Sequence, residues 1–270
     1  CQDEQFSHLS LLTGQYSLIP PDNPIIGFVG HGAILPCQLQ GKIILDKLSI
    51  QWIFSGNSTE KAVATFDGKN RKNPVLESKV YEGRTEFFPL EFYWGNLSLL
   101  LKNVHPLDKE KYTCVVFLDN WYNEVVVDLD VAAQGAEPSI FLDGHAGNGI
   151  GLSCRSQGWF PEPSVVWLDS QGWTRPEEVT TRSTPVPSSG VFDVVSSTSL
   201  EPGSDQEVSC RVVNEVLNAT RESRVRIADC FFPSPSFSPS SPSFPWMLAS
   251  LIVLSLDLGI IGAVVYKMKR

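Results

Sequence analysis

Two pairs of widely separated cysteines divide this chain into two blocks. Cys37 and Cys114 bound the first block, and Cys154 and Cys210 bound the second. No CxxC motif occurs, so the sequence supports neither a zinc ribbon nor thioredoxin-like redox chemistry. Long-range cysteine pairs are typical of proteins that fold in an oxidising compartment, where disulfides persist. The cysteine pattern therefore predicts an extracellular chain with one disulfide in each block.

The segments between the cysteines have the composition of β-strands. Short runs of β-branched and aromatic residues alternate with Gly, Pro, Asn and Asp, and no amphipathic stretch of helical period occurs between the two ends. Such runs lie at residues 48–54, 96–104, 112–118, 125–131, 164–168 and 206–213. Short strands at this spacing, with turn residues between them, are typical of β-sandwiches and barrels. We therefore predict an all-β fold.

Each block also has a tryptophan shortly after its first cysteine, Trp52 in one and Trp167 in the other. In a β-sandwich, a cysteine from each sheet can bridge the two inner faces while a tryptophan packs against the sulfurs. This Cys…Trp…Cys order is that of immunoglobulin domains. The longer gap in the first block leaves room for two extra strands, at about residues 61–74, and predicts a variable-type domain over 15–132. The shorter gap predicts a constant-type domain over 133–229.

The run DKEKYTC, residues 108–114, joins a charged turn to a strand. Tyr112 stands two positions before the second cysteine of the block. In immunoglobulin domains a tyrosine at this place turns its hydroxyl back onto the backbone of the preceding corner. Asp108 lies in that corner and is expected to pair with Arg84. We expect these residues to support the fold and not to form a binding site.

The segment 246–266, WMLASLIVLSLDLGIIGAVVY, has one charge, Asp257, and the length that a helix needs to cross a bilayer. The cations of residues 267–270 follow directly, so the positive-inside rule predicts a short cytoplasmic tail. Residues 230–245 are rich in Pro and Ser and predict an extended stalk. The sequence thus predicts a single-pass type I protein of the plasma membrane with an extracellular N-terminus, from which a signal peptide has been removed.

The predicted span contains features that favour association within the membrane. Asp257 can pair with a basic residue in a partner's membrane helix, or it can be protonated and tolerated among apolar neighbours. Ser255, Gly259 and Ala263 form a row of small residues that lets two helices approach closely. A homodimer, or a heterodimer with a related chain, is therefore a possible assembly.

Covalent modification is predicted at several extracellular positions. Asn57, Asn96 and Asn218 each begin an N-x-S/T sequon without proline, and each is a candidate glycosylation site. Cys1 and Cys230 lie outside the two cysteine pairs. Cys230 begins the stalk, where it can form an interchain disulfide or remain free or otherwise paired.

Four motifs in order give the chain a specific resemblance. They are GHGAILPCQL, YEGRTEFF, DKEKYTC and SCRSQGWFPEPSVVW. Together they resemble the butyrophilin and butyrophilin-like family, and the GWFPEPSVVW run at residues 158–167 is the most characteristic. The resemblance covers about residues 15–266. It implies a cell-surface ligand, related to T-cell costimulatory molecules, that engages receptors on T cells and more often restrains activation than raises it; some members act through γδ T-cell receptors. Many butyrophilins have an intracellular SPRY-type domain, and no activity that needs this domain is assigned here.

The predicted partner-binding residues lie between strands F and G of the first domain. Variable-type domains bind through the loops at one end or through the exposed face of the sheet with strands C, F and G. We expect a loop at residues 118–124 and single out Asn120, Trp121 and Tyr122, because tryptophan and tyrosine bury a large area at little entropic cost. The alternative for each ring is that it caps the sandwich. We expect at least one of them to contact a partner.

A second aromatic cluster is expected to serve mainly the core and the contacts between strands. It comprises Phe87, Phe88, Phe92, Tyr93 and Trp94. Trp159 and Phe160, near the start of the second domain, are expected to pack between the domains.

Other classes of function have no support in the sequence. The net charge of −9 argues against nucleic acid as a partner. The four histidines are far apart, and neither an HExxH, a GxSxG nor a phosphate-binding glycine loop occurs. We therefore predict no enzyme, no cofactor and no metal site. Two alternatives to a ligand remain: a homophilic adhesion protein, and a receptor that signals through an adaptor paired with Asp257.

Overall fold

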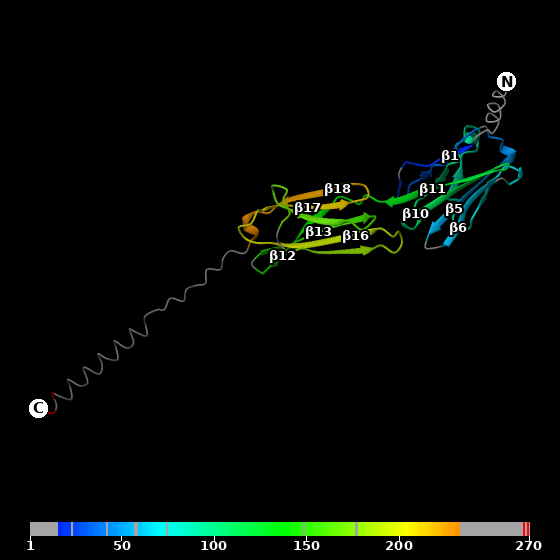
Figure 1. Ribbon diagram of the computed structural model, residues 1–270. Helices are drawn as coiled ribbons and strands as arrows, with labels where there is room; N and C mark the ends of the chain where they lie inside the picture. The colour runs from blue at the N-terminus through cyan, green and yellow to red at the C-terminus, as the bar shows by residue number, and fades with distance from the viewer. Residues whose placement is uncertain are drawn as a thin grey trace, which may run out of the picture.

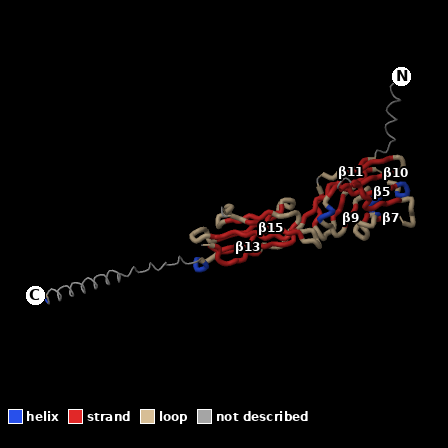
Figure 2. Tube along the Cα trace, turned by 90° about the horizontal axis from the view of Figure 1, so that it is seen from below, coloured by secondary structure: helices blue, strands red, loops and turns tan. Residues whose placement is uncertain are grey.

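The computed structural model describes residues 16–232, apart from 23, 42, 57, 58, 74, 148, 176 and 177, together with residues 267 and 269. In this part of the chain, two β-sandwiches follow one another (Figure 1). Strands make up most of both domains, and the helical segments within them are short 3-10 helices (Figure 2). The prediction of an all-β fold is confirmed.

The first sandwich has one large and one small sheet. The strands of the large sheet are β2 (Ile25–Phe28), β5 (Leu48–Gly56), β6 (Thr59–Asp67), β7 (Val75–Glu77), β10 (Glu110–Leu118) and β11 (Trp121–Ala132). The small sheet consists of β3 (Ala33–Leu35), β8 (Thr85–Phe87) and β9 (Leu99–Leu101), while β1 (Ser17–Ile19) pairs with β4 (Gln38–Gln40). The short 3-10 helices are η1 (Leu45–Lys47), η2 (Pro89–Trp94) and η3 (Pro106–Asp108).

The strand order of the large sheet is β2, β11, β10, β5, β6, β7. Strands β6 and β7 are the two extra strands that distinguish a variable-type from a constant-type domain. The sequence placed them at about residues 61–74. The first overlaps this range, but the second begins only at Val75.

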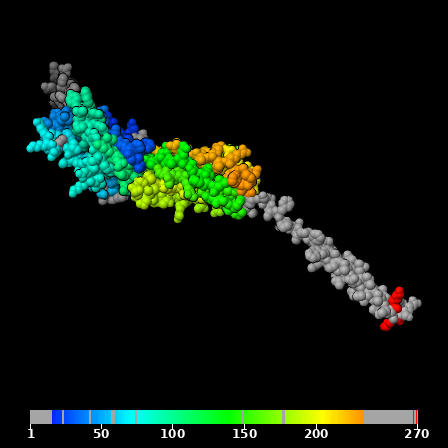
Figure 3. All heavy atoms as spheres, turned by 180° about the vertical axis from the view of Figure 1, so that it is seen from behind, coloured from blue at the N-terminus to red at the C-terminus, as the bar shows by residue number. Residues whose placement is uncertain are grey.

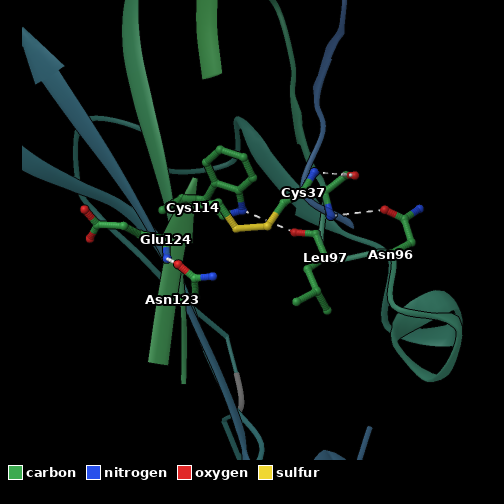
Figure 4. Close-up of a disulfide and its surroundings, with 8 residues drawn as sticks. Cys37, Asn96, Leu97, Cys114, Asn123 and Glu124 are labelled. Atoms are coloured by element: carbon green, nitrogen blue, oxygen red, sulfur yellow. Dashed lines mark hydrogen bonds between the residues drawn. A yellow bond between two sulfur atoms is a disulfide. The ribbon is translucent and has the colours of Figure 1, made fainter. Parts of the chain in front are cut away.

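The core of the first sandwich is built around a disulfide between Cys37 and Cys114. Trp52 is fully buried, and its indole Nε1 donates a hydrogen bond to the carbonyl oxygen of Leu97 at 3.3 Å (Figure 4). The backbone N–H of Cys37 donates to Oγ of Ser98 at 3.1 Å. The polar atoms of this buried region therefore have partners on the segment that leads into β9.

In its described residues, the second sandwich has no counterpart of β6 and β7 and is of the constant type. One sheet consists of β12 (Ser139–Ala146), β13 (Gly149–Trp159), β16 (Phe192–Leu200) and β15 (Thr180–Pro185) in that order, and the other of β14 (Ser164–Leu168), β17 (Glu207–Asn214) and β18 (Ala219–Arg226). A short helix, η4 (Asp229–Phe231), follows. A disulfide joins Cys154 to Cys210, and the buried indole of Trp167 donates to Oγ of Ser196 at 3.0 Å.

The corner before β10 is held by a buried ion pair and a tyrosine hydroxyl. The hydroxyl of Tyr112 donates to the carbonyl oxygen of Asp108 at 3.0 Å. Burial raises the pKa of Tyr112 well above its usual range, so the hydroxyl stays neutral. The Asp108 carboxylate pairs with the guanidinium of Arg84, and the two side chains are only 7% and 20% exposed. It also accepts the backbone N–H of His105 at 2.8 Å.

The two domains meet at a joint with its own hydrogen bonds. Ala133 and Phe160 exchange both backbone hydrogen bonds, at 2.8 and 3.1 Å. The Nδ2 atom of Asn214 donates to the carbonyl oxygens of both residues, at 3.1 and 2.8 Å. Phe160 packs against the core of the first domain, as expected of an interdomain residue. Trp159 instead lies in the core of the second domain. In the space-filling view the domains adjoin at this joint (Figure 3).

The predicted span 246–266, with Asp257, Gly259 and Ala263, lies outside the described residues. The same is true of residues 233–245 of the predicted stalk. Within the part of the chain that the structure describes, no helix has the length and hydrophobicity required to cross a bilayer.

The buried pair at the corner predicts a large effect of a single substitution. Arg84→Met leaves the Asp108 carboxylate buried without its cation, and we expect it to lower the free energy of unfolding of the first domain by about 3 kcal/mol. Lys102→Met is the matched control, because Lys102 pairs with Glu86 on the surface, with side chains 45% and 55% exposed. This substitution should cost less than about 1 kcal/mol. Urea unfolding measures both values, and equal losses would contradict the prediction.

Candidate protein-binding face

The large sheet of the first domain has an outer side on which apolar residues gather. We call it the front face and define it by Ile53, Val115, Phe117, Tyr122 and Val126. These residues come from the three central strands, β5, β10 and β11. Apart from the exposed Asn123, their sequence neighbours point into the sandwich, because side chains along a strand alternate between the two sides of a sheet.

Strand β10 explains why apolar groups face outward. Val115, Val116, Phe117 and Leu118 are consecutive, but a strand can turn only every second side chain into the core. Val116 and Leu118 are buried among the core residues. Phe117 consequently lies on the outer side and is 42% exposed. Val115 also lies on this side, where neighbouring strands cover most of it.

The register of the strands brings the front-face residues together. Phe117 lies directly opposite Tyr122, with ring centroids 5.1 Å apart. Thr113 lies between Ile53 on β5 and Val126 on β11. Tyr122 is 52% exposed and Val126 is 47% exposed. Between these two groups lies Val115, flanked by Gln51 and the exposed Glu124. The result is a strip open to solvent in which exposed aromatic and aliphatic side chains alternate with polar ones.

Two ion pairs bound this strip at its two ends. Lys47 and Asp119 pair at 2.8 Å beside the β10–β11 turn, and Lys111 and Asp128 pair at 3.8 Å toward the other end. All four side chains are about half exposed, so each pair contributes little to stability. They form instead a charged edge at the two ends of the strip, while Glu124 is the charged group within it.

Tyr122 makes a further polar contact on the front face. Its hydroxyl donates a hydrogen bond to the carboxylate of Glu124, two residues along the same strand. This hydrogen bond raises the pKa of Tyr122, because it stabilises the protonated hydroxyl. The ring thus has one polar end and one large apolar side, the combination that suits aromatic residues at interfaces.

The structure corrects the expected loop at residues 118–124. Strand β10 ends at Leu118 and β11 begins at Trp121, so the turn consists of Asp119 and Asn120 alone. Trp121 and Tyr122 belong to a strand and face opposite sides. Trp121 is half-buried against the first core, with its ring 5.5 Å from that of Tyr16, whereas Tyr122 points outward. Asn120 is exposed in the turn and lines a shallow hollow there.

The second aromatic cluster divides into a buried and an exposed part. Phe87 and Phe92 are buried and pack on Phe66, with centroids 6.4 and 4.7 Å from its ring, as expected for a core role. Phe88 is half-buried. The expectation was wrong for Tyr93 and Trp94, which are 61% and 76% exposed. A 3-10 helix as short as η2 has an inner and an outer side, and these two rings lie on the outer side.

The predicted modification sites differ in their surroundings. Asn57 and Cys1 lie outside the described residues. Asn96 is half-buried at the start of the segment leading into β9, and Asn218 is exposed in the turn between β17 and β18. Cys230 is exposed, with a free thiol, in η4. Within the described ranges, no group of three or more His, Cys, Asp or Glu side chains is arranged to hold a metal ion.

Comparisons with protein-family models match both domains. Residues 21–132 match the immunoglobulin V-set domain. Residues 134–222 match the model described as "Butyrophilin subfamily 3 member A2-like, Ig-C domain". The two matches adjoin at the joint between the domains.

Similar proteins and structures agree with these models. Over 91% of the present chain, the sequence is 29% identical to human butyrophilin subfamily 2 member A2. Over 93% of the present chain, it is 29% identical to bovine butyrophilin subfamily 1 member A1. It spans 45% of the length of each of these relatives. The crystal structure of bovine butyrophilin superposes with a TM-score of 0.68 and 29% identity, covering 79% of this chain and 99% of that one. A structure of ICOS in complex with ICOS-L includes a chain of the same fold, with a TM-score of 0.64 and 22% identity, covering 77% of this chain and 100% of that one.

The opposite orientations of Trp121 and Tyr122 predict different effects on stability. Trp121→Ala removes a ring that packs on Tyr16 and the core, and should lower the free energy of unfolding by about 2 kcal/mol. Tyr122→Ala loses only the cross-strand contact with Phe117 and should cost less than about 1 kcal/mol. Chemical unfolding of the two variants gives these values. A loss for Tyr122→Ala as large as that for Trp121→Ala would contradict the assignment of the two sides.

Proposed function

The chain belongs to the butyrophilin and butyrophilin-like family of the immunoglobulin superfamily, and we propose that it is a cell-surface ligand whose front face binds a protein receptor on T cells. Binding would regulate T-cell activation and cytokine production, and we propose restraint as its direction. The mechanism is recognition across a cell–cell contact and involves no catalytic step.

The observation that carries this proposal is the exposed apolar strip of the front face. Phe117, Tyr122 and Val126 are each more than two-fifths exposed on the outer side of the large sheet. Large apolar side chains exposed together and rimmed by polar groups are typical of protein–protein interaction sites. Interfaces also have a centre depleted of charge and enriched in tyrosine and phenylalanine, within a polar rim. The two Lys–Asp pairs supply such a rim.

The comparisons support a partner of the receptor class. One structure with this fold comes from a complex of ICOS with ICOS-L, and the family resemblance implies a relation to costimulatory ligands. Specific complexes bury about 800 Å² per partner, and we propose that the outer side of the six-stranded sheet supplies this area. No small-molecule cleft is required for this kind of binding.

The proposed arrangement at the membrane follows from the order of the segments. We propose a variable-type domain at 15–132, a constant-type domain at 133–229 and a stalk at 230–245, anchored by a helix at 246–266 and a tail at 267–270. In this order the first domain is farthest from the membrane and presents its front face to the opposing cell. The joint fixed by Asn214 would help to hold this domain outward.

A T-cell assay with front-face variants tests the proposal. The full chain is displayed on cells that also present a T-cell receptor stimulus, and proliferation is compared for the unchanged chain and for a Tyr122→Ala, Val126→Ala double variant. We expect the unchanged chain to lower proliferation. The double variant should lose this effect, with receptor affinity reduced roughly tenfold or more, because truncation of a hot-spot tyrosine costs about 2 kcal/mol or more.

The matched control is Ile34→Ala. Ile34 is 54% exposed, similar to Tyr122, but lies on β3 in the opposite sheet, so this variant should keep full activity. Equal activity of the double variant and the unchanged chain would place the binding site elsewhere. Clustering of the expressing cells without T cells, with no effect on proliferation, would support the adhesion alternative.

A further inference from the structure

Among the described residues, the most exposed pair of adjacent aromatic side chains outside the front face lies on η2, next to a sequon. Trp94 is 76% exposed and Tyr93 is 61% exposed, and their rings contact each other edge-to-face with centroids 5.2 Å apart. Asn96 follows two residues after Trp94, in the sequon Asn96-Leu97-Ser98. The front face does not account for this pair, because η2 connects β8 and β9 of the opposite sheet.

We propose that Asn96 carries an N-linked glycan and that Tyr93 and Trp94 form the surface on which its first sugar packs. The aliphatic C–H groups on one side of an N-acetylglucosamine ring carry slight positive charge, and the face of an aromatic ring is negative. A sugar attached two residues from an exposed indole therefore has a complementary surface within reach. The glycan is the occupant that explains two large rings left open to solvent.

The backbone holds Trp94 and Asn96 at the same place on the domain. Gly95, between them, has a φ of 84°, and a Cβ there would lie 1.9 Å from the carbonyl oxygen of Leu39, so only glycine fits. The side chain of Gln38 donates to the carbonyl oxygen of Trp94 at 3.0 Å, and the backbone of Gln38 pairs with that of Asn96. Both residues are thus anchored on the same strand.

The amide of Asn96 is oriented in a way that is compatible with a sugar. Its Oδ1 accepts the backbone N–H of Ser98 at 3.1 Å, and its Nδ2 donates to the carboxylate of Glu91 (Figure 4 shows the Oδ1 contact). The nitrogen has two hydrogens, so one can be replaced while the other keeps the bond to Glu91. The two contacts fix the plane of the amide and hence the direction in which the sugar leaves it.

The covalent step is a transfer from a lipid-linked oligosaccharide pyrophosphate. The bond between C1 of the sugar and the pyrophosphate oxygen breaks, a bond between C1 and Nδ2 of Asn96 forms, and the amide loses one proton as the lipid pyrophosphate leaves. In the folded domain, Oγ of Ser98 is buried and accepts the N–H of Cys37. Transfer therefore takes place before this part of the chain folds around the Cys37–Cys114 disulfide.

Oxidation footprinting tests whether a sugar covers Trp94. The full chain is purified in mild detergent from a glycosylating eukaryotic cell line, and one sample is trimmed to a single N-acetylglucosamine while another is fully deglycosylated with an amidase. Hydroxyl-radical oxidation of each tryptophan is then measured by mass spectrometry. A contact as strong as other aromatic contacts should slow oxidation of Trp94 roughly fivefold in the trimmed sample. Trp173, 70% exposed in the second domain, is the internal control and should not change.

A thermal-unfolding cycle gives an independent answer. Trp94→Ala should lower the Tm of the trimmed chain by about 3 °C but leave the Tm nearly unchanged in an Asn96→Gln background, where no sugar is present. Leu90→Ala, on the same helix and 94% exposed, should have the same small effect in both backgrounds. Asn218→Gln is a second control: no aromatic residue lies within five positions of Asn218, so loss of this sequon should leave the effect of Trp94→Ala unchanged.

Three results would overturn the proposal. They are an unmodified Asn96 in the mass spectrum, equal oxidation of Trp94 in the two samples, and the same Tm change for Trp94→Ala in both backgrounds. If Asn96→Gln fails to fold, the footprinting experiment still decides, because both of its samples are prepared from the folded, glycosylated chain; the amidase step leaves Asp in place of Asn96 in the deglycosylated sample. None of these results bears on the front face, which lies on the other sheet.

Discussion

The first domain depends on the covalent link between its two sheets. The Cys37–Cys114 disulfide and the indole of Trp52 occupy the centre of the core, and a disulfide of this kind stabilises a small domain by about 2–4 kcal/mol. Because the inner sides of both sheets are committed to this core, binding is left to the outer sides. The ion pair of Arg84 and Asp108 stabilises one corner of the same sandwich, and because both side chains are largely buried, it offers little surface to a partner.

The two outer sides then have different characters. The front face has an apolar strip between two exposed ion pairs, which suits a flat protein partner. The opposite sheet has the η2 aromatics beside Asn96, which suit a sugar. A glycan on this side would hinder contacts with proteins there and leave the front face open. The proposed glycan and the proposed binding site therefore lie on different sides of the first domain and do not overlap.

Much of this fold could be predicted because it rests on patterns of residue type along the chain. The sequence predicts a variable-type and a constant-type domain. This prediction rests on the two Cys…Trp…Cys patterns, the tyrosine before Cys114 and the longer gap between the cysteines of the first block. The candidate site was predicted less well. Tyr122 was singled out, but as part of a loop, and Phe117 and Val126 were missed. The run of consecutive apolar residues from Val115 to Leu118 indicates an exposed apolar surface, since a strand with one solvent-facing side cannot bury all of them.

The sequence by itself determined the fold class, because strand periodicity and cysteine spacing are local properties that can be counted along the chain. It also determined that two adjacent aromatic residues, Trp121 and Tyr122, lie near a turn. Only the tertiary structure decided which of them faces a partner. The choice depends on a turn of just two residues, Asp119 and Asn120, because one residue more or less would exchange the inner and outer sides of β11. Turn length and pairing register are set by both strands together, and neither strand alone specifies them.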